Sequence, residues 1–352
     1  MTKHILIVNN GLAGGGIERA SVSLANYFSK MNFEVSVLAL YKSEPFFSLD
    51  NNILFIEPDF DRNNHNKLVY TYRMMVFLRK FVLKNKPNTI LAFSEWTNPY
   101  VVLALKGIEV PLFLSDRMNP LAKLPFLSEF LRKRLYKKAT GIIAQSNFAK
   151  SILEKKTSSK NIKVIYNPLN SIEKIDCPQL NRIVTVGRLE KVKGHEFLIK
   201  AFAKMDNKSW ELSIVGDGSE RKYLESLAKD LNITQRVIFH GHLKDFRKQL
   251  SEAKIFVLPS IKEGFPNALI EAMSVPLTCI CTDFFNGHNE IIQNNENGII
   301  VKSANVGELS NALSLLINDE SKRNLFASNA KKVREELNFE KIAGIYLDFI
   351  LN

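Results

Sequence analysis

The sequence predicts an α/β protein of two domains, each a doubly wound parallel sheet flanked by helices. A length of 352 residues exceeds what one hydrophobic core usually supports. Short apolar runs alternate with longer helical stretches along the chain, the pattern of parallel strands joined by crossover helices. A polar connection at 170–179, after which this alternation starts again, is where we place the domain boundary.

The predicted elements divide the chain into three segments. Strands of the first domain, residues 1–168, are expected at 4–8, 34–40, 53–57, 89–93, 112–115, 141–144 and 162–166. Strands of the second domain, residues 169–335, are expected from Arg182 and at 210–215, 236–240 and 255–258. Residues 336–352 contain a predicted amphipathic helix, roughly 339–351.

Composition and charge narrow the function classes. No apolar run approaches the roughly 20 residues that span a bilayer, and the first residues lack the apolar core of a signal peptide. We therefore expect a cytoplasmic protein. The net charge of +12 favours anionic partners, whether nucleotides, lipid headgroups or nucleic acid. Because no RNA- or DNA-binding module is recognisable, we expect no nucleic-acid partner, although nucleic-acid binding stays open as an alternative.

The stretch around Glu263 carries the most specific chemical pattern. The apolar run 255–258 predicts a buried strand, Pro266 interrupts the chain, and a helix is expected from Asn267. Glu263 then lies at the carboxyl end of a strand and Glu271 about one turn inside the helix, where open α/β sheets bind ligands. The helix start favours an anion, whereas two carboxylates accept hydrogen bonds from paired hydroxyls. A nucleotide sugar offers both groups.

This stretch resembles the retaining glycosyltransferases of the family 4 type, whose fingerprint is E-G-F-P-x-x-x-x-E-A. The resemblance implies that Glu271 holds the ribose hydroxyls and Glu263 the donor sugar, with Phe265, Pro266 and Asn267 also contacting the donor. The alternative is that Glu271 only complements the helix dipole and that Glu263 is a solvated loop charge.

The resemblance also implies a fold and a reaction. The fold is GT-B, in which two Rossmann-like domains face each other across a cleft and the C-terminal helix packs on the N-terminal domain. The N-terminal domain binds the acceptor and the C-terminal domain binds the donor. The reaction moves a hexosyl or N-acetylhexosaminyl group, with retention, from a nucleoside diphosphate sugar, for which we expect UDP. A GT-B epimerase or phosphorylase is the alternative within enzymes.

A second stretch, G-R-L-x-x-x-K-G, places Arg188 and Lys193 on one strand-to-helix loop. Two cations on such a loop can bracket a diphosphate and neutralise the charge that builds as it leaves. The family has the same pattern, which implies a catalytic role for both; the alternative is ordinary surface charge. Four further donor contacts are implied by the resemblance: Gly216, Gly218, His242 and Leu243.

Metal and cofactor sites are not expected. His240 and His242 alternate along a predicted strand, so they face opposite ways, and no carboxylate cluster accompanies them. Front-face departure, in which the leaving phosphate takes the acceptor proton, is the mechanism usually proposed for the family, and it would explain why no separate nucleophile and acid pair is evident. We expect no cofactor.

The first domain has two weaker signals. The motif G-G-x-E-R at Gly15 and Gly16 is similar to the family's glycine loop, which implies a donor contact; a tight turn is the alternative. Neither a P-loop nor a dinucleotide fingerprint fits this loop. Arg117 stands where many family members have histidine. It is predicted to contact the donor sugar or an acceptor phosphate, and an ion pair with Asp116 or Glu95 is the alternative.

The segment Phe126 to Lys138 combines apolar residues with five basic ones. Such a helix can lie on an anionic membrane surface, and the alternative is a core-packed helix with a solvated basic face. We expect a glycan acceptor, with a lipid-linked glycan as its more specific form, in surface polysaccharide or glycoconjugate assembly. If this helix binds lipid, the protein is peripheral on the inner face of the cell membrane.

Overall fold

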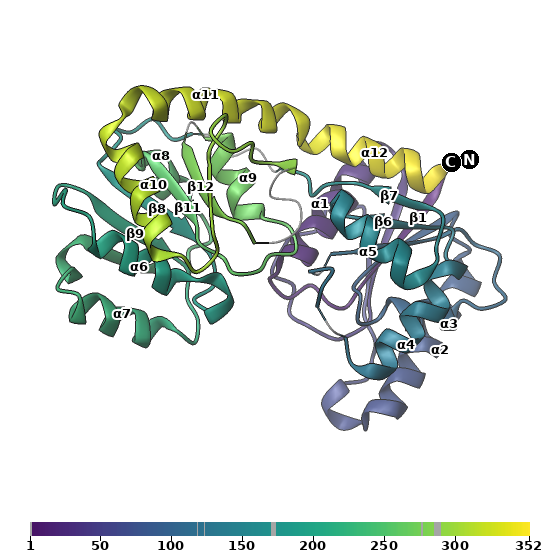
Figure 1. Ribbon diagram of the computed structural model, residues 1–352. Coiled ribbons are helices and arrows are strands. Elements are labelled where there is room, and N and C mark those ends of the chain that lie inside the picture. Colours follow the sequence, from purple (N-terminus) through teal and green to yellow (C-terminus); the bar gives the residue numbers. More distant parts are fainter. Residues whose placement is uncertain (1, 118, 123, 170–173, 276, 285–289) are drawn as a thin grey trace. The chain divides into compact units, whose positions relative to one another are not determined.

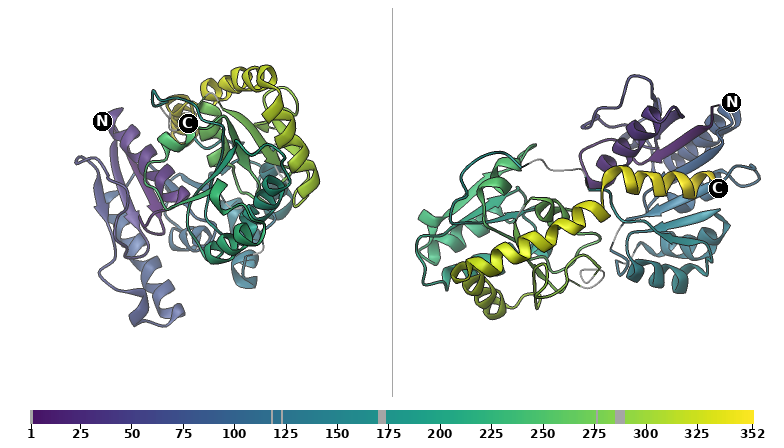
Figure 2. Two further views of the ribbon diagram at one scale, coloured as in Figure 1. Left: turned by 90° about the vertical axis from the view of Figure 1, so that its left-hand side faces the viewer. Right: turned by 90° about the horizontal axis from the view of Figure 1, so that it is seen from above.

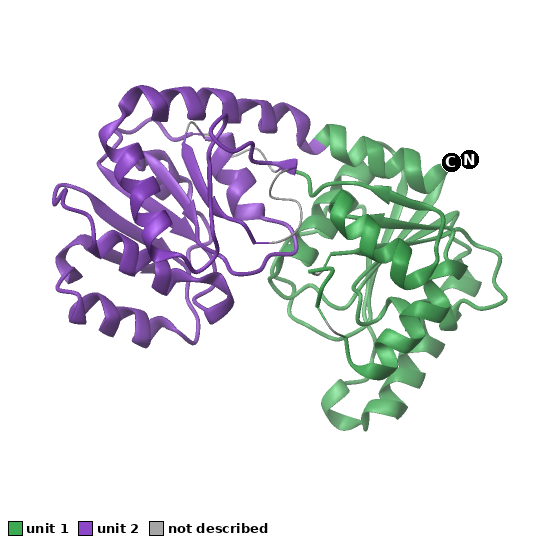
Figure 3. Cartoon of the chain, in the orientation of Figure 1, with its two compact units in different colours: residues 1–168, 340–352 green, residues 169–339 purple. Residues whose placement is uncertain are grey.

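A computed structural model shows that the chain forms two compact units (Figure 3). It describes residues 2–117, 119–122, 124–169, 174–275, 277–284 and 290–352. Unit 1 comprises residues 1–168 and 340–352, and unit 2 comprises residues 169–339. Each unit has one sheet in which the paired strands are parallel (Figure 1), so the predicted α/β class with two doubly wound domains is confirmed.

Unit 1 is built on a seven-stranded sheet in the order β3-β2-β1-β4-β5-β6-β7. Its strands are β1 (His4–Asn9), β2 (Glu34–Ala39), β3 (Leu54–Ile56), β4 (Thr89–Phe93), β5 (Leu112–Asp116), β6 (Gly141–Ala144) and β7 (Ile162–Val164). Its α-helices are α1 (Gly16–Lys30), α2 (Lys67–Asn85), α3 (Asn98–Ala104), α4 (Phe126–Leu135), α5 (Asn147–Thr157) and, except for its first residue, α12 (Phe339–Leu351). Two 3-10 turns, η1 (Arg62–Asn64) and η2 (Tyr136–Lys138), precede α2 and follow α4.

The helices of unit 1 form two layers because successive strand residues face opposite sides of the sheet. Alternate residues such as Leu6, Ile90 and Leu114 share one core with α2 to α5. The intervening residues meet the other layer, where the Phe113 ring lies 5.1 Å from that of Phe349 in α12. Figure 2 shows α12, in yellow, running along unit 1.

Unit 2 repeats this plan with a six-stranded sheet in the order β10-β9-β8-β11-β12-β13. Its strands are β8 (Arg182–Val186), β9 (Glu211–Val215), β10 (Val237–Gly241), β11 (Ile255–Leu258), β12 (Thr278–Thr282) and β13 (Ile299–Val301). Its α-helices are α6 (His195–Ala203), α7 (Arg221–Asp230), α8 (Arg247–Glu252), α9 (Asn267–Ser274), α10 (Val306–Asn318) and α11 (Glu320–Glu336). The 3-10 turns η3 (Lys191–Lys193) and η4 (Thr234–Arg236) precede α6 and β10. One core joins α6, α7 and α10 to the sheet.

Most strands lie where the apolar runs predicted them, and the differences are at the strand ends. The largest is at the edge of unit 1, where β7 stops at Val164 instead of continuing to residue 166. Its neighbour β6 ends at Ala144, which pairs with Val164. The amide of Ile165 still donates to the carbonyl oxygen of Ala144 at 2.9 Å, and regular pairing ends there because β6 goes no further.

Each sheet has one point at which the strand order reverses. In unit 1 the point lies between β1 and β4, and in unit 2 it lies between β8 and β11. At such a point the loops that follow the two strands run to opposite sides of the sheet. Open α/β sheets bind ligands between these loops, at the carboxyl ends of the two strands. Both reversal points therefore contain candidate binding loops.

Candidate active site

In unit 2, the loops that follow β8 and β11 are held against each other. The backbone amide of Ile261 donates a 2.8 Å hydrogen bond to the carbonyl oxygen of Val192. Gly194 has φ +67°, and a Cβ atom added there would lie 2.1 Å from the carbonyl oxygen of Pro259. Only glycine permits this approach, because it has no Cβ and tolerates positive φ. The reversal point is therefore a tightly joined pair of loops.

Lys193 and Glu263 meet across these two loops. The Nζ atom of Lys193 lies 2.7 Å from Oε1 and 2.9 Å from Oε2 of Glu263, and Ser260 Oγ donates a 2.6 Å hydrogen bond to Oε1. Glu263 is 9% exposed and the Lys193 side chain 20% exposed, so this ion pair is partly shielded from water. The sequence reasoning missed Ser260, although its place two residues after the strand end was a usable signal.

Arg188 is in a different environment from Lys193. Its side chain is 72% exposed, and its Nη1 atom donates a 2.6 Å hydrogen bond to Glu190 two residues later. An exposed pair of this kind is weak because water screens it. The two cations predicted to bracket a diphosphate share a loop but differ in shielding.

His195 lies buried at the start of α6, next to this loop. Burial lowers the pKa of His195 to about 4; the Arg188 backbone acts in the opposite direction, and the positive charge of Lys193 lowers the pKa further. The imidazole is therefore neutral near pH 7. It adds no second positive charge beside Lys193.

Gly216 and Gly218 support the loop that carries Arg188. Gly216 has φ +140°, and a Cβ atom there would lie 1.9 Å from the carbonyl oxygen of Gly187; at Gly218 it would lie 2.5 Å from that of Leu189. The amide of Gly216 also donates to the carbonyl oxygen of Gly241 at 2.8 Å. The loops after β10, β9, β8 and β11 thus form one continuous rim, which includes His242 and Leu243 directly after β10.

The helix α9 begins at Asn267, as predicted, and has no acidic residue in its first turn. Phe265 and Pro266 are buried directly before it, and Glu271 is buried in its second turn. The amide of Asn267 donates to the carbonyl oxygen of Phe265 at 3.0 Å, and the amide of Leu269 donates to Pro266. The turn into the helix therefore uses the amide of Asn267, and the predicted donor contacts of Phe265, Pro266 and Asn267 stay predictions.

The reversal point of unit 1 carries neutral polar groups. Asn10 Nδ2 donates to Ser94 Oγ at 2.7 Å, and Thr97 Oγ1 donates to Asn10 Oδ1 at 2.7 Å. Ser94 has φ +125°, unusual for a residue with a side chain. Sequence reasoning missed this cluster, because asparagine, serine and threonine are common in ordinary loops.

The glycine loop of unit 1 leads into α1, which begins at Gly16. The Glu18 side chain folds over Gly15, where an added Cβ atom would lie 2.3 Å from Glu18 Oε2. Burial raises the pKa of the Glu18 carboxyl, and a hydrogen bond to its own backbone amide opposes that shift. Gly15 and Gly16 lie at the reversal point of unit 1, and their predicted donor contact stays a prediction.

Arg117 lies buried between β5 and α12. Its Nη2 atom donates a 3.0 Å hydrogen bond to the hydroxyl of Tyr346, its guanidinium lies 5.2 Å from the centre of the Phe93 ring, and its backbone amide donates to Glu95. These contacts indicate that Arg117 anchors α12 to the sheet of unit 1. The sequence did not suggest this role for Arg117. The predicted contact with the donor sugar stays a prediction.

The preceding residue, Asp116, faces the opposite helix layer. Its Oδ2 atom lies 3.2 Å from Nη2 of Arg132, and both side chains are buried. Burial raises the pKa of Asp116, and Arg132 opposes that shift. In the segment Phe126–Lys138, Phe126 and Phe130 are therefore exposed, whereas Arg132 and Leu135 are buried.

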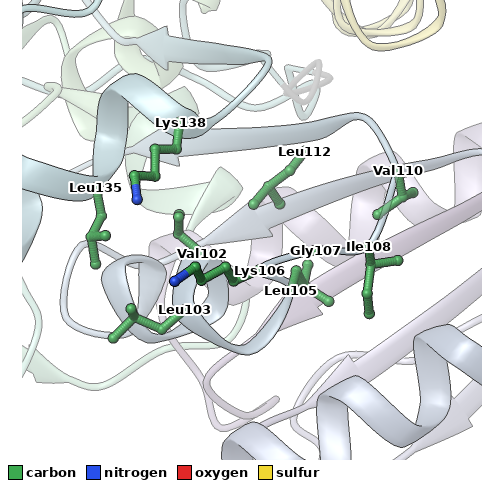
Figure 4. A pocket seen from close by; sticks show the side chains of 10 residues that line it. All are labelled: Val102, Leu103, Leu105, Lys106, Gly107, Ile108, Val110, Leu112, Leu135 and Lys138. Carbon is green, nitrogen blue, oxygen red and sulfur yellow. The ribbon is translucent and has the colours of Figure 1, made fainter.

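Outside these loops, unit 1 has a pocket of about 210 Å³ between α3, the start of β5 and the end of α4 (Figure 4). Its lining is apolar except for Lys106 and Lys138, and it contains none of the residues predicted to contact the donor. In the described part of the chain no group of three or more His, Cys, Asp or Glu could hold a metal ion. Across the same residues, no helix combines the length and apolar character of a membrane span.

Comparison with known proteins matches each half of the chain to a family of glycosyltransferases. Residues 173–333 match the family described as glycosyl transferases group 1, and residues 14–171 match the family described as Glycosyltransferase Family 4. The chain belongs to the family 4 type of glycosyltransferases. The resemblance inferred from the Glu263 stretch and the Arg188 loop is therefore confirmed.

Two similar relatives come from Campylobacter jejuni. One is a GalNAc-alpha-(1->4)-GalNAc-alpha-(1->3)-diNAcBac-PP-undecaprenol alpha-1,4-N-acetyl-D-galactosaminyltransferase, 28% identical over 96% of both chains. The other is an N-acetylgalactosamine-N,N'-diacetylbacillosaminyl-diphospho-undecaprenol 4-alpha-N-acetylgalactosaminyltransferase, 26% identical over 97% of both chains.

Solved structures show the same fold in related glycosyltransferases. A glycosyltransferase from Rickettsia africae has a TM-score of 0.84 and 18% identity, with all of both chains covered. Anabaena HepE, solved in complex with UDP, has a TM-score of 0.85 and 18% identity over 99% of both chains. The present chain therefore has the GT-B fold of two Rossmann-like domains, as the sequence predicted.

Proposed function

We propose that this glycosyltransferase transfers a hexosyl or N-acetylhexosaminyl group from a UDP-linked donor, with retention, to a lipid-linked glycan. The observation that carries the proposal is the meeting of Lys193 and Glu263 at the strand reversal of unit 2. One loop supplies a cation for phosphate and the other a carboxylate for sugar hydroxyls. The UDP complex of Anabaena HepE supports the choice of nucleotide.

In this proposal unit 2 binds the donor. The ammonium group of Lys193 has three N–H bonds, so it can hold Glu263 and still donate to the diphosphate. Arg188 adds charge at the exposed edge, Glu271 accepts from the ribose hydroxyls, and the rim formed by the loops after β8, β9 and β10 holds the base and phosphates. Glu263, fixed by Ser260, orients the sugar ring.

The proposed step is a front-face displacement at the anomeric carbon. The bond from this carbon to the β-phosphate oxygen breaks, and its electron pair goes to the leaving UDP. The acceptor hydroxyl bonds to the same face and gives its proton to the departing phosphate oxygen. Lys193 and Arg188 stabilise the negative charge that grows on this phosphate, which lowers the barrier.

The proposed acceptor is a glycan on a lipid diphosphate. Both relatives from C. jejuni act, by their names, on undecaprenol-linked acceptors. In unit 1 the exposed part of α4 suits work at a membrane surface, since Phe126 is 87% exposed and Lys133, Arg134 and Lys137 are exposed beside it. We propose that the protein acts at the inner face of the cell membrane.

The test is a donor and acceptor screen with the purified protein. UDP-GalNAc, UDP-GlcNAc, UDP-glucose and GDP-mannose are each incubated with a polyprenyl-diphosphate-linked oligosaccharide, and NMR reads the anomeric configuration of the product. The proposal predicts UDP release together with an α-linked product from an α-linked donor. A β-linked product would show that the configuration at the anomeric carbon is inverted, which would contradict the proposed retention. Consumption of the donor without an acceptor would indicate epimerisation or hydrolysis instead. Phosphate-dependent cleavage of a glycan would indicate a phosphorylase.

A further inference from the structure

The outer side of α2 exposes a stripe of large apolar side chains. Leu68, Tyr72 and Leu83 are 79%, 65% and 52% exposed. Tyr72 follows Leu68 by about one turn and Leu83 follows Tyr72 by about three, so the three lie along one line of the helix. The opposite side of the helix is buried in the core of unit 1 through Tyr70, Met74, Leu78 and Val82. The outer stripe is therefore not needed for packing within the unit.

The charges of α2 are all positive. Its 19 residues include five Lys or Arg and no Asp or Glu. Arg79 is used structurally, because it donates to the carbonyl oxygens of Ala104 and Lys106 at the end of α3. Lys80 and Lys84 are exposed beside the apolar stripe, and neither forms an ion pair among the residues that the structure describes.

This combination matches an anionic lipid surface. Apolar side chains of an interfacial helix enter the boundary between headgroups and acyl chains, while flanking lysines reach the phosphates. A nucleic acid would satisfy the lysines and leave Leu68, Tyr72 and Leu83 in water. We propose that the outer side of α2 docks on the anionic headgroups of a lipid bilayer.

The position of α2, packed against α3 on the same face of the sheet as α4, supports a lipid surface as the partner. Helix α3 packs against both α2 and α4, and all three cover the same face of the sheet, so their outer sides point away from it together. Leu103 of α3 is exposed, and the apolar pocket with Lys106 and Lys138 lies between α3 and the end of α4. The lipid-facing surface therefore extends from α4, through α3, to α2.

The inference rests on the membrane part of the proposed function and is independent of the donor. It predicts that the full-length protein sediments with vesicles of phosphatidylcholine and phosphatidylglycerol but not with vesicles of phosphatidylcholine alone. The triple variant Leu68→Ser/Tyr72→Ser/Leu83→Ser should lower the fraction bound by about tenfold or more, because it removes the apolar contribution. The variant Lys80→Glu/Lys84→Glu should lower the fraction bound to a similar extent, because it removes two positive charges that attract the anionic headgroups.

Unit 2 provides matched controls. Leu315→Ser/Leu325→Ser and Lys331→Glu/Lys332→Glu change exposed residues of α10 and α11 and should leave vesicle binding unchanged. Unfolding curves confirm that each variant folds. Equal losses in the controls, or wild-type binding by both α2 variants, would overturn the inference.

Two further measurements separate the alternatives. Sedimentation velocity of the free protein would reveal a dimer that the α2 substitutions dissociate, and that result would overturn lipid docking in favour of self-association. Transfer to a water-soluble acceptor analogue reports the proposed reaction by itself. No vesicle binding by the wild-type protein, with transfer intact, rejects only α2 docking. No transfer by the wild-type protein, with vesicle binding intact, rejects only the proposed reaction.

Discussion

The two units have the same strand reversal but fill it with different chemistry. In unit 2 the reversal holds a shielded ion pair, Lys193 with Glu263, on loops joined by backbone contacts. In unit 1 it holds the neutral cluster of Asn10, Ser94 and Thr97. A sheet topology thus provides the position of a crevice, and the loop residues decide what it can bind. The charged pair of unit 2 suits a diphosphate sugar, and the amide and hydroxyl groups of the unit 1 cluster suit hydroxyl groups.

The largest effect that this comparison predicts is the loss of Lys193. Lys193→Ala should lower kcat by about a hundredfold or more, because it removes a cation from the growing phosphate charge. Arg188→Ala should cost about tenfold, since its side chain is exposed and already pairs with Glu190. Steady-state release of UDP measures both. Equal effects of the two substitutions would show that shielding does not distinguish these cations.

The tight joining of the unit 2 loops is tested at Gly194. Gly194→Ala should lower the free energy of unfolding by about 2 kcal/mol or more, because both φ and the carbonyl oxygen of Pro259 oppose a Cβ atom. Gly107→Ala is the matched control: its φ is +79°, but nothing lies within 4 Å of the added atom. Chemical denaturation should show the smaller loss at Gly107, and equal losses would mean that the loop contact adds nothing.

In unit 1 the corresponding test concerns Arg117. If it anchors α12, Arg117→Ala and Tyr346→Phe should each lower the free energy of unfolding by about 1–2 kcal/mol, because a buried donor or acceptor loses its partner. Their kcat values should then stay close to each other. A far lower kcat in Arg117→Ala than in Tyr346→Phe would support the predicted contact with the donor sugar.

The smallest effect concerns the neutral histidine beside the unit 2 site. The pKa of His195 is about 4 in the folded protein against an ordinary value near 6.5, so between these values the unfolded state binds more protons and stability falls as pH decreases. The difference in unfolding free energy between wild type and His195→Gln should shrink by about 1 kcal/mol from pH 7.5 to pH 5.5. A difference that does not change with pH would mean that His195 is not held neutral.

Sequence reasoning predicted the parts of the molecule in which local pattern and chemistry coincide. Strands such as β11 are continuous apolar runs, and the spacing of Glu263 and Lys193 within their motifs already indicated a donor site. The contact between these two side chains was not predictable, because it depends on how two loops 70 residues apart meet.

The segment around Arg132 shows the opposite case. Its run of basic residues suggested one exposed charged face, but strand alternation turns Asp116 toward α4, where it takes Arg132 into a buried pair. Exposed leucine and tyrosine residues on α2 were equally hidden in the sequence, because helical spacing does not tell which apolar side of a helix is covered.

The most direct test of the central claim is a crystal structure of the protein with UDP bound. We predict a diphosphate at the carboxyl ends of β8 and β11, with Lys193 Nζ within hydrogen-bond distance of a phosphate oxygen and Glu263 facing the position of the sugar. A diphosphate bound elsewhere, with Lys193 still paired only to Glu263, would contradict it.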